Sequence, residues 1–430
     1  MNRRIVITGM GVISSAGIGK EAFWRGISSG RSGIGRIEAF DVSNCPTQIA
    51  GEVRDFSPKE YVKPRKALKV MARDIQMAVA AAAMAVDDSR VKEAVDPERM
   101  GVSLGAGLIS SDVGELGMAI AHARDDSGAF DIRKFGAEGM EFLFPLWLLK
   151  YLPNMLACHM SIIHDARGPS NTITTACAAS SQAIGEACRI IGRGAADVMV
   201  CGGAESKINA VSLVRYILFG GLSERNDEPE RACRPFDRDR DGVVLGEGGG
   251  LLVIEELEHA RKRGATIYAE IAGYGTTCDV SAASRVDTGN HARTDCMRSS
   301  LQDGGLNPGD LDLICACGLG SKKSDRLEAE AIQELLGNRA PSVPVTSIKS
   351  IIGHLGAGAG AVELIACVLA INHGLIPPTL NCDNPEEGLD LDFVANQPRQ
   401  ADIQVALSTT SSFAGQNAAI AVRKYVEQDV

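Results

Sequence analysis

Apolar residues along the chain fall into short strand-like runs that end in small residues, and these runs occur in pairs. The pairs are Arg4–Gly11 with Ile267–Gly275, Val102–Gly107 with Leu313–Gly318, and Gly246–Ile254 with Ala414–Val422. The two runs of the last pair are continuously apolar, as strands buried on both faces are. Similar pieces in the same order indicate a duplication. The sequence therefore predicts an α/β protein of two similar halves, residues 1–260 and 261–430, that share one core.

A glycine pair, Gly9 and Gly11, follows the first apolar run, where a dinucleotide-binding loop carries its glycines. Such a loop needs a third glycine, but Ser14 stands there, and no acidic residue follows a second strand at the required spacing. The pair therefore predicts a tight turn, and we expect no cofactor.

Composition excludes several classes of protein. Of 430 residues, 45% are hydrophobic and 23% charged, which is enough for a large core. The net charge of −10, without any block of Lys or Arg, argues against a nucleic-acid partner. The most lipid-like window, Phe142–Leu156, is interrupted by Pro145, Lys150 and Pro153, so no membrane span is expected. Twelve cysteines without an export signal indicate reduced thiols and a cytoplasmic location.

The strongest chemical signal is Cys177. A β-branched run, Thr172–Thr175, ends just before it, and an Ala-rich stretch follows in which Ile184, Cys188 and Ile191 recur at roughly helical spacing. The cysteine thus lies between a strand and a helix, where the helix N-terminus favours a thiolate and small neighbours leave the sulfur approachable. This pattern predicts a nucleophile; the alternative is a core cysteine at a turn.

A second group of candidate residues surrounds His354. A glycine precedes it and a Gly/Ala-rich helix start follows, so a substrate can approach the imidazole closely. Lys349 lies five residues before it and Glu363 nine residues after it, which makes His354 the best proton handler of the seven histidines. No His/Cys cluster has convincing zinc spacing, and Cys315-x-Cys317 has no second pair, so no metal is expected.

These motifs resemble those of the type II β-ketoacyl-acyl carrier protein synthases, which belong to the thiolase-fold group. The segments that carry the resemblance span nearly the whole chain: Val6–Gly11, Gly168–Ser170, Thr175–Cys177, Ala196–Glu205, Arg234–Asp237, Asp241–Glu247, Lys349–Glu363, Pro377–Asn381, Asn384–Pro385 and Leu391–Val394. The resemblance implies a thiolase-like five-layered αβαβα fold made of two duplicated halves. It also implies a homodimer that extends acyl chains carried on acyl carrier protein, in fatty acid or related biosynthesis.

The resemblance further implies roles for single residues. Cys177 would take the acyl chain, and backbone N–H groups at Cys177 and in the Phe413–Asn417 loop would form the oxyanion hole. His354 would stabilise the enolate left by decarboxylation of a malonyl unit, with Lys349 among the catalytic residues. Leu108 and Phe413 would bound the acyl channel. Four positions are expected on the substrate-binding side: Leu108, Glu363, Ser321 and Asp325.

One catalytic histidine of the family is missing. Where its motif reads Asn-Ala-His-Gly-Thr-x-Thr, this chain has Cys315-Ala-Cys-Gly-Leu-Gly-Ser321, so Cys317 replaces the histidine and Leu319 replaces a threonine that contacts the pantetheine arm. Asp325 still aligns beyond the motif. Because a thiol is a poorer donor than imidazole, and loss of one such donor costs about 10² to 10³ in rate, we expect altered or impaired malonyl decarboxylation.

Three functions remain open after this replacement. The first is a condensing enzyme with modified chemistry, in which Cys317 acts as a second thiol. The second is an acyltransferase that loads and unloads Cys177 without extension. The third is a partner subunit similar to a chain-length factor, in a heterodimer with an active synthase.

An acidic carrier protein needs a basic docking patch on this negatively charged chain. Lys66 and Lys69, with Arg73 nearby, predict such a patch; the alternative is an ordinary solvated helix face.

Overall fold

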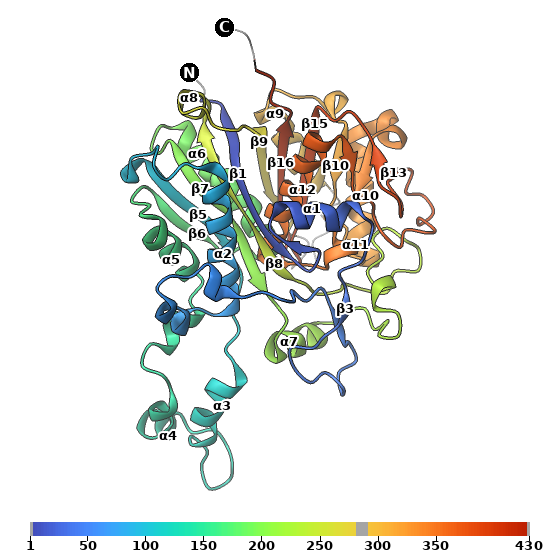
Figure 1. The fold of residues 1–430 in the computed structure, drawn as a ribbon. Helices are drawn as coiled ribbons and strands as arrows, with labels where there is room; N and C mark the ends of the chain where they lie inside the picture. Colours follow the sequence, from blue (N-terminus) through green and yellow to red (C-terminus); the bar gives the residue numbers. More distant parts are fainter. Residues whose placement is uncertain (1–2, 281–290, 428–430) are drawn as a thin grey trace.

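The middle of the molecule is formed by β1 (Ile5–Ser14) and β9 (Ala269–Cys278), which pair antiparallel in a twelve-stranded sheet. The computed structural model describes residues 3–280 and 291–427 (Figure 1). From one edge to the other, the sheet order is β13 (Asp392–Phe393), β11 (Pro344–Thr346), β10 (Leu313–Cys315), β15 (Val405–Ser411), β16 (Gln416–Arg423), β9, β1, β8 (Glu247–Glu256), β7 (Val198–Ser206), β5 (Met100–Ala106) and β6 (Ser170–Ile173). A short strand, β2 (Gly17–Ile18), also pairs with β1.

This order is mirrored about the centre of the sheet. On each side the first neighbour is antiparallel, β8 on β1 and β16 on β9, and the strands further out include parallel pairs such as β5 with β6 and β10 with β11. The strand pairs with similar sequences, β1 with β9, β5 with β10 and β8 with β16, occupy equivalent places. The duplication is therefore present in the sheet, while the boundary at residue 260 stays a prediction.

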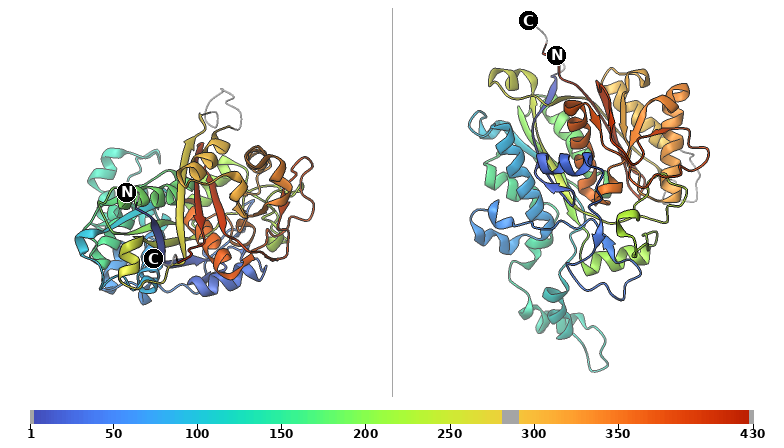
Figure 2. Two further views of the ribbon diagram at one scale, coloured as in Figure 1. Left: turned by 90° about the horizontal axis from the view of Figure 1, so that it is seen from above. Right: turned by 45° about the vertical axis from the view of Figure 1, so that its right-hand side comes forward.

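Helices form three layers around the two halves of the sheet (Figures 1 and 2). Between the halves lie α6 (Ala179–Gly192), which packs on β5 and β7, and α12 (Ala359–His373), which packs on β15 and β8. The outer faces are covered by α2 (Arg73–Ser89) and α5 (Met155–His164) on one side and by α9 (His291–Asp303) with α10 (Lys322–Leu336) on the other. The predicted five-layered αβαβα fold is confirmed.

The remaining elements are short. The helices are α1 (Lys20–Ser28), α3 (Val113–Ala121), α4 (Ile132–Ala137), α7 (Ala210–Phe219), α8 (Leu257–Lys262) and α11 (Lys349–Ile352). Two small antiparallel pairs, β3 (Gly35–Arg36) with β4 (Ile49–Ala50) and β12 (Leu375–Ile376) with β14 (Arg399–Gln400), lie outside the main sheet.

The central helix α12 is apolar all round, because it has a sheet on two sides. The segment Gly356–His373 is long and apolar enough to cross a membrane, but 89% of it is buried inside the protein. Such burial is typical of a core helix. Within the Phe142–Leu156 window the structure has a 3-10 turn, Trp147–Tyr151, and the start of α5, and no continuous helix spans it.

Gly9 and Gly11 do not form a turn, so the tight turn expected there is wrong. Both lie inside β1, directly beneath α2. A Cβ atom on Gly11 would lie 1.9 Å from the carbonyl oxygen of Ala81, and one on Gly9 would lie 2.2 Å from that of Ala85. The glycines are required because the helix backbone packs directly on the strand.

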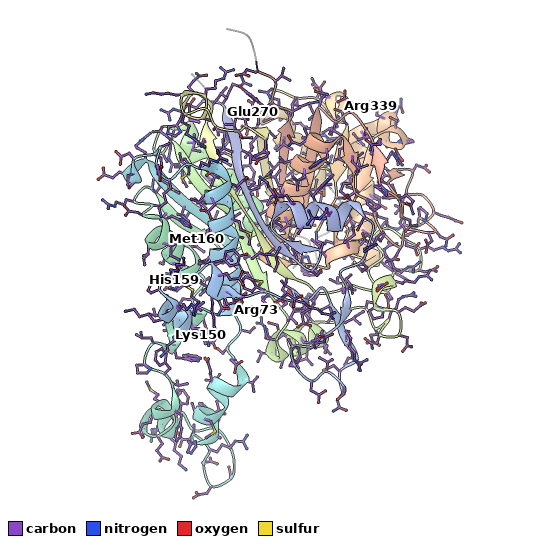
Figure 3. All side chains as sticks on the ribbon, viewed as in Figure 1. Arg73, Lys150, His159, Met160, Glu270 and Arg339 are labelled. Atoms are coloured by element: carbon purple, nitrogen blue, oxygen red, sulfur yellow. The ribbon has the colours of Figure 1, made fainter. Side chains whose placement is uncertain are left out.

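A long excursion between β5 and α5, residues 107–154, projects from the body and carries α3 and α4 (Figures 1 and 2). We call it the arm. Lys150 lies at its base (labelled in Figure 3) and forms an ion pair with Glu115. The Tyr151 hydroxyl donates to the same carboxylate over 2.6 Å. Many large apolar side chains of the arm are exposed: Val113, Met118, Phe130, Ile132, Met140, Phe142, Phe144, Leu146 and Leu148.

Candidate active site

Cys177 lies in the turn between β6 and α6, as the sequence pattern predicts. A 3-10 turn, Ala176–Ala178, joins the two elements, and Cys177 is only 2% exposed. Ala176 has a φ of 52°, a left-handed conformation that costs energy in any residue with a side chain.

The Cys177 sulfur faces His354. Its Sγ lies 3.0 Å from the Nε2 atom of His354, which is also buried. The histidine lies between α11 and α12, and its backbone is fixed on both sides: its N–H donates to the carbonyl of Val244 over 2.8 Å, and its carbonyl accepts from Gly246 over 2.9 Å. The turn between β6 and α6 and the segment between α11 and α12 thus bring Cys177 and His354 into contact.

Burial determines the resting charge of this pair. It raises the pKa of Cys177 to about 12, helped by Cys317 and Glu205, and it lowers the pKa of His354 to about 3, helped by the Lys349 and Lys207 cations. The thiol therefore stays protonated and donates to a neutral imidazole. This differs from the expected thiolate, because the cost of desolvating a charge outweighs the attraction of one helix end. In the described part of the chain His354 Nδ1 is buried without a partner, which fits a tautomer with its proton there.

Cys317 lies beside a buried cation at the end of β10. Lys349 Nζ donates to the Cys317 carbonyl over 2.8 Å and lies 3.6 Å from the Cys317 sulfur. The ammonium forms an ion pair with Glu363, whose second oxygen accepts from Thr410 Oγ1 over 3.1 Å. Burial raises the pKa of Cys317 to about 12. Cys317 is thus a neutral thiol that donates to the Ser411 carbonyl, 3.8 Å away.

Two carboxylates of α10 fix the loop that follows Cys317. Glu328 accepts from the backbone N–H groups of Cys317 and Gly318 at 2.7 and 2.8 Å. Asp325 accepts from those of Leu319 and Gly320 at 2.9 and 3.0 Å, and burial raises its pKa to about 6. Because both oxygens of each carboxylate are engaged by the loop, these residues position it.

A cavity of about 900 Å³ opens beside Cys177. Leu108 and Phe413 line it, as expected for residues that bound an acyl channel. Three residues expected on the substrate-binding side lie outside its lining: Glu363 and Asp325, which are buried and bonded as described above, and Ser321, which caps the N-terminus of α10. The two carboxylates are buried outside the cavity lining, and the Ser321 hydroxyl accepts from the Ser324 N–H, so all three residues bond to neighbouring protein groups.

Phe413 lies at the start of the loop between β15 and β16. Its ring stands edge-on to that of His354, with centroids 6.2 Å apart, and lies 5.7 Å from the ring of Phe219. In the described residues its backbone N–H has no hydrogen-bond acceptor. A free donor next to the Cys177–His354 pair is what an oxyanion hole requires.

Four polar cavity residues were missed by the sequence reasoning: Glu205 and Lys207 at the end of β7, and Arg215 and Tyr216 on α7. Lys207 forms an ion pair with Glu205 and donates to the Leu108 carbonyl over 3.0 Å. Only Glu205 had a signal, as the last residue of a motif that resembles the family's. The others reach the cavity through the path of the loop between β7 and α7, which no local pattern reveals.

Lys66 and Lys69 lie exposed on a 3-10 turn, Arg65–Val70, and within the described residues no carboxylate lies within salt-bridge distance of either. Arg73, the first residue of α2 (labelled in Figure 3), does not extend this patch, which corrects the expectation. It forms an ion pair with the buried Glu247 at the start of β8. Across residues 3–280 and 291–427 no cluster of three His, Cys, Asp or Glu side chains has a geometry that would hold a metal ion.

Comparison with known proteins places this geometry in a family. Residues 2–260 match the model of the β-ketoacyl synthase N-terminal domain, and residues 268–383 match that of its C-terminal domain. The chain is 39% identical to 3-oxoacyl-acyl-carrier-protein synthase 2 of Coxiella burnetii, over 98% of this chain and 99% of that one. It is 37% identical to the tetracenomycin polyketide synthase ketoacyl synthase alpha subunit of Streptomyces glaucescens, over 98% and 97%.

A solved structure described as the ishigamide ketosynthase/chain length factor superposes with a TM-score of 0.87 at 34% identity, over 99% of this chain and all of that one. Identity of this degree over full length, with both domain models matched, establishes the relationship. The chain belongs to the β-ketoacyl synthase family.

Proposed function

We propose that this protein takes an acyl group from acyl carrier protein onto Cys177 and that its extension chemistry is modified at Cys317. The observation that carries the proposal is the buried Cys177–His354 pair, 3.0 Å between Sγ and Nε2, at a cavity large enough for an acyl chain. A thiol, a neutral base and a free backbone donor are the parts that transthioesterification needs.

The acylation step follows from these positions. As the Cys177 sulfur attacks the thioester carbonyl, His354 Nε2 takes the thiol proton, so no thiolate has to exist at rest. The negative charge that develops on the carbonyl oxygen is stabilised by the backbone N–H of Phe413. The carrier thiolate then leaves with the proton returned by His354, and the acyl group remains on Cys177.

The extension step is where we propose the change. A Cys317 thiol whose pKa is raised to about 12 is neutral, and a thiol is a weak hydrogen-bond donor. The Lys349 ammonium, 3.6 Å from the Cys317 sulfur, supplies the positive charge in this pocket. We propose that malonyl decarboxylation is slow here and that Cys317 acts as a second thiol next to the acylated Cys177.

The second candidate function, acyl transfer without extension, is favoured by the same replacement, since the Cys177–His354 pair and the Phe413 donor do not involve Cys317. The third, a partner subunit similar to a chain-length factor, has support from the ketosynthase/chain length factor structure, but such subunits usually lack the nucleophile that this chain keeps. The exposed apolar arm supports a dimer, with a second copy or with another synthase.

The proposed carrier contact is the exposed pair Lys66 and Lys69. A solved relative of 30% identity, with a TM-score of 0.83, is described as a type II PKS acyl-carrier protein in complex with its ketosynthase. An acidic carrier suits two exposed lysines without carboxylate partners.

A cytoplasmic location is part of this proposal, and all twelve cysteines are free thiols in the structure.

The experiment that tests the proposal separates the two half-reactions. The protein is incubated with acyl carrier and malonyl carrier substrates, and acyl-Cys177 is followed by intact mass while CO₂ and ketoacyl product are measured separately. We expect rapid acylation with little CO₂. Acylation that survives Cys177→Ala, or that maps mainly to another cysteine, contradicts the proposal. Acylation without any ketoacyl product favours the non-extending acyltransferase.

A further inference from the structure

The cavity beside Cys177 contains charges that a channel for a hydrocarbon chain does not need. Its apolar wall includes Leu108, Leu218, Phe219 and Phe413, but Glu205, Lys207, Arg215 and Tyr216 also line it. Polar groups in a largely apolar site fix the orientation and identity of a ligand. Only a polar group that is not already engaged by the protein can bind a ligand in this way.

Glu205 and Lys207 are largely used by the protein. The Glu205 carboxylate accepts from the Ala357 N–H over 2.6 Å and forms an ion pair with Lys207, whose Nζ also donates to the Leu108 carbonyl. Both side chains are buried, at 3% and 8% exposed. Their charges cancel, so they contribute a fixed neutral pair to the wall.

Arg215 is different. Among the residues that the structure describes, no carboxylate lies within salt-bridge distance of its guanidinium, and no protein group accepts a hydrogen bond from it. The next residue, Tyr216, has no hydrogen-bond partner for its hydroxyl in the same part of the chain. With Glu205 and Lys207 neutralising each other, the lining carries one uncompensated positive charge and an adjacent hydroxyl donor.

These two side chains lie on a helix face that looks into the cavity. Ser212, Arg215, Tyr216 and Phe219 are spaced three or four residues apart along α7, so they share one side of the helix, and all four line the cavity. The Ser212 hydroxyl is already paired with that of Ser110 at 2.8 Å. The free donors on this face are therefore those of Arg215 and Tyr216.

We propose that this cavity selects acyl groups that carry a carboxylate at the end remote from the thioester, which Arg215 binds. This inference rests on the proposed acylation of Cys177. Arg215 is an exposed residue of the lining, so an alkyl chain that ends beside it gains nothing from the guanidinium, whereas a carboxylate accepts two parallel N–H bonds from it, with the half-buried Tyr216 hydroxyl as a further donor. A charge-assisted contact of this kind corresponds to roughly 10- to 100-fold in discrimination.

The chemistry of loading is unchanged by this selection. The bond between the thioester carbonyl carbon and the carrier sulfur breaks, the bond from that carbon to Cys177 Sγ forms, and the thiol proton passes through His354 to the departing sulfur. The remote carboxylate takes no part in the reaction. It only holds the chain in the cavity while the carbonyl lies at the nucleophile.

The test compares N-acetylcysteamine thioesters of octanoic acid and of suberic acid, which match in length and differ in the remote carboxylate. The rate of Cys177 acylation in the full chain is followed by intact mass. We expect the suberyl thioester to react at least tenfold faster at low salt, with the preference falling as ionic strength rises. Arg215→Leu should shift the ratio by tenfold or more toward octanoyl, and Arg215→Lys should retain part of the preference. Arg189→Leu, an exposed arginine outside the cavity lining, should leave the ratio unchanged.

The outcomes separate this inference from the proposed function. If both thioesters acylate Cys177 but octanoyl reacts faster, or if the ratio is the same in Arg215→Leu, the selection is wrong and the acylation stands. If neither thioester acylates a Cys177 that iodoacetamide still modifies, the proposed function itself fails. An effect of Arg215→Leu seen only with phosphopantetheine thioesters assigns the arginine to the phosphate and overturns the selection.

Discussion

Cys177 Sγ and His354 Nε2 lie 3.0 Å apart in the centre of the molecule, although they belong to opposite halves of the chain. Helices α6 and α12, which begin just after these residues, contact each other between the two halves of the sheet. The pair is therefore a product of the duplication, because the equivalent central helices of the two halves bring their N-terminal ends together.

Substitution of His354 tests its role as the base. Because the Cys177 thiol is protonated at rest, His354→Gln should slow acylation by about 10²- to 10⁴-fold, the usual contribution of a general base. The measurement is the single-turnover rate of acyl-Cys177 formation by intact mass. His373→Gln, at an exposed histidine stacked on Trp24, is the matched control and should react at the parent rate. An unchanged rate in His354→Gln would remove the base from the mechanism.

The pH dependence of Cys177 alkylation tests the protonation state. Alkylation proceeds through the thiolate, and with a pKa of about 12 the thiolate fraction increases tenfold for each pH unit below that value. The iodoacetamide rate at Cys177 should therefore keep rising from pH 7 to pH 10 without a plateau. The exposed Cys278 reports intrinsic reagent reactivity in the same peptide map. A plateau of the alkylation rate at neutral pH would show that Cys177 is already a thiolate there, as the helix N-terminus predicted.

Replacement of Gly11 tests the close packing of α2 on β1. In Gly11→Ala the new Cβ would lie 1.9 Å from the Ala81 carbonyl oxygen, so helix and strand must separate, at a cost at the upper end of the about 1–3 kcal/mol typical of overpacking. Thermal unfolding measures the loss as a fall in Tm. Gly117→Ala in α3 is the control: no atom lies within 4 Å of its added Cβ, and we expect equal or higher stability. Equal Tm values in both variants would mean that the packing relaxes.

Local patterns predicted what depends on local structure. The β-branched run and the Ala-rich stretch placed Cys177 at a strand-to-helix turn, and the paired apolar runs predicted the duplicated sheet. The prediction of a tight turn at Gly9 and Gly11 was wrong, because a turn and a close contact between a strand and a helix both require glycine. The expected thiolate failed for a similar reason: the helix end is visible in the sequence, but the burial that outweighs it is not.

The residues that sequence reasoning missed reach the cavity because of the path that the chain takes between two elements. Lys207 and Arg215 are an ordinary lysine and arginine in the sequence, and only the turn from β7 into α7 brings them to the cavity. The basic patch was predicted with one residue too many, since Arg73 has the same side chain as a surface arginine but is committed to the buried carboxylate of Glu247. Such pairings between distant segments carry no local signature.

Introduction of an imidazole at position 317 tests the proposal that malonyl decarboxylation is slow because Cys317 stands where the family's motif has a histidine. Cys317 and Leu319 pack with Val243 in a small buried cluster, and the Lys349 ammonium lies beside the Cys317 sulfur. Cys317→His adds a strong donor beside the Lys349 ammonium, but it also adds volume at a site that is 1% exposed, so the double variant with Leu319→Thr removes bulk from the same cluster. We expect CO₂ release from malonyl carrier to rise by about 10²- to 10³-fold in the double variant, the effect of one preorganised donor.

Acylation of Cys177 is the control for that experiment, because it uses His354 and the Phe413 donor and should change little when Cys317 is replaced. A double variant that folds and acylates normally, but releases no more CO₂ than the parent protein, would show that the whole pocket is shaped for a different second substrate. In that case the buried Lys349 becomes the residue whose substitution should next be measured, since its ammonium holds a positive charge next to the thiol and donates to the Cys317 carbonyl.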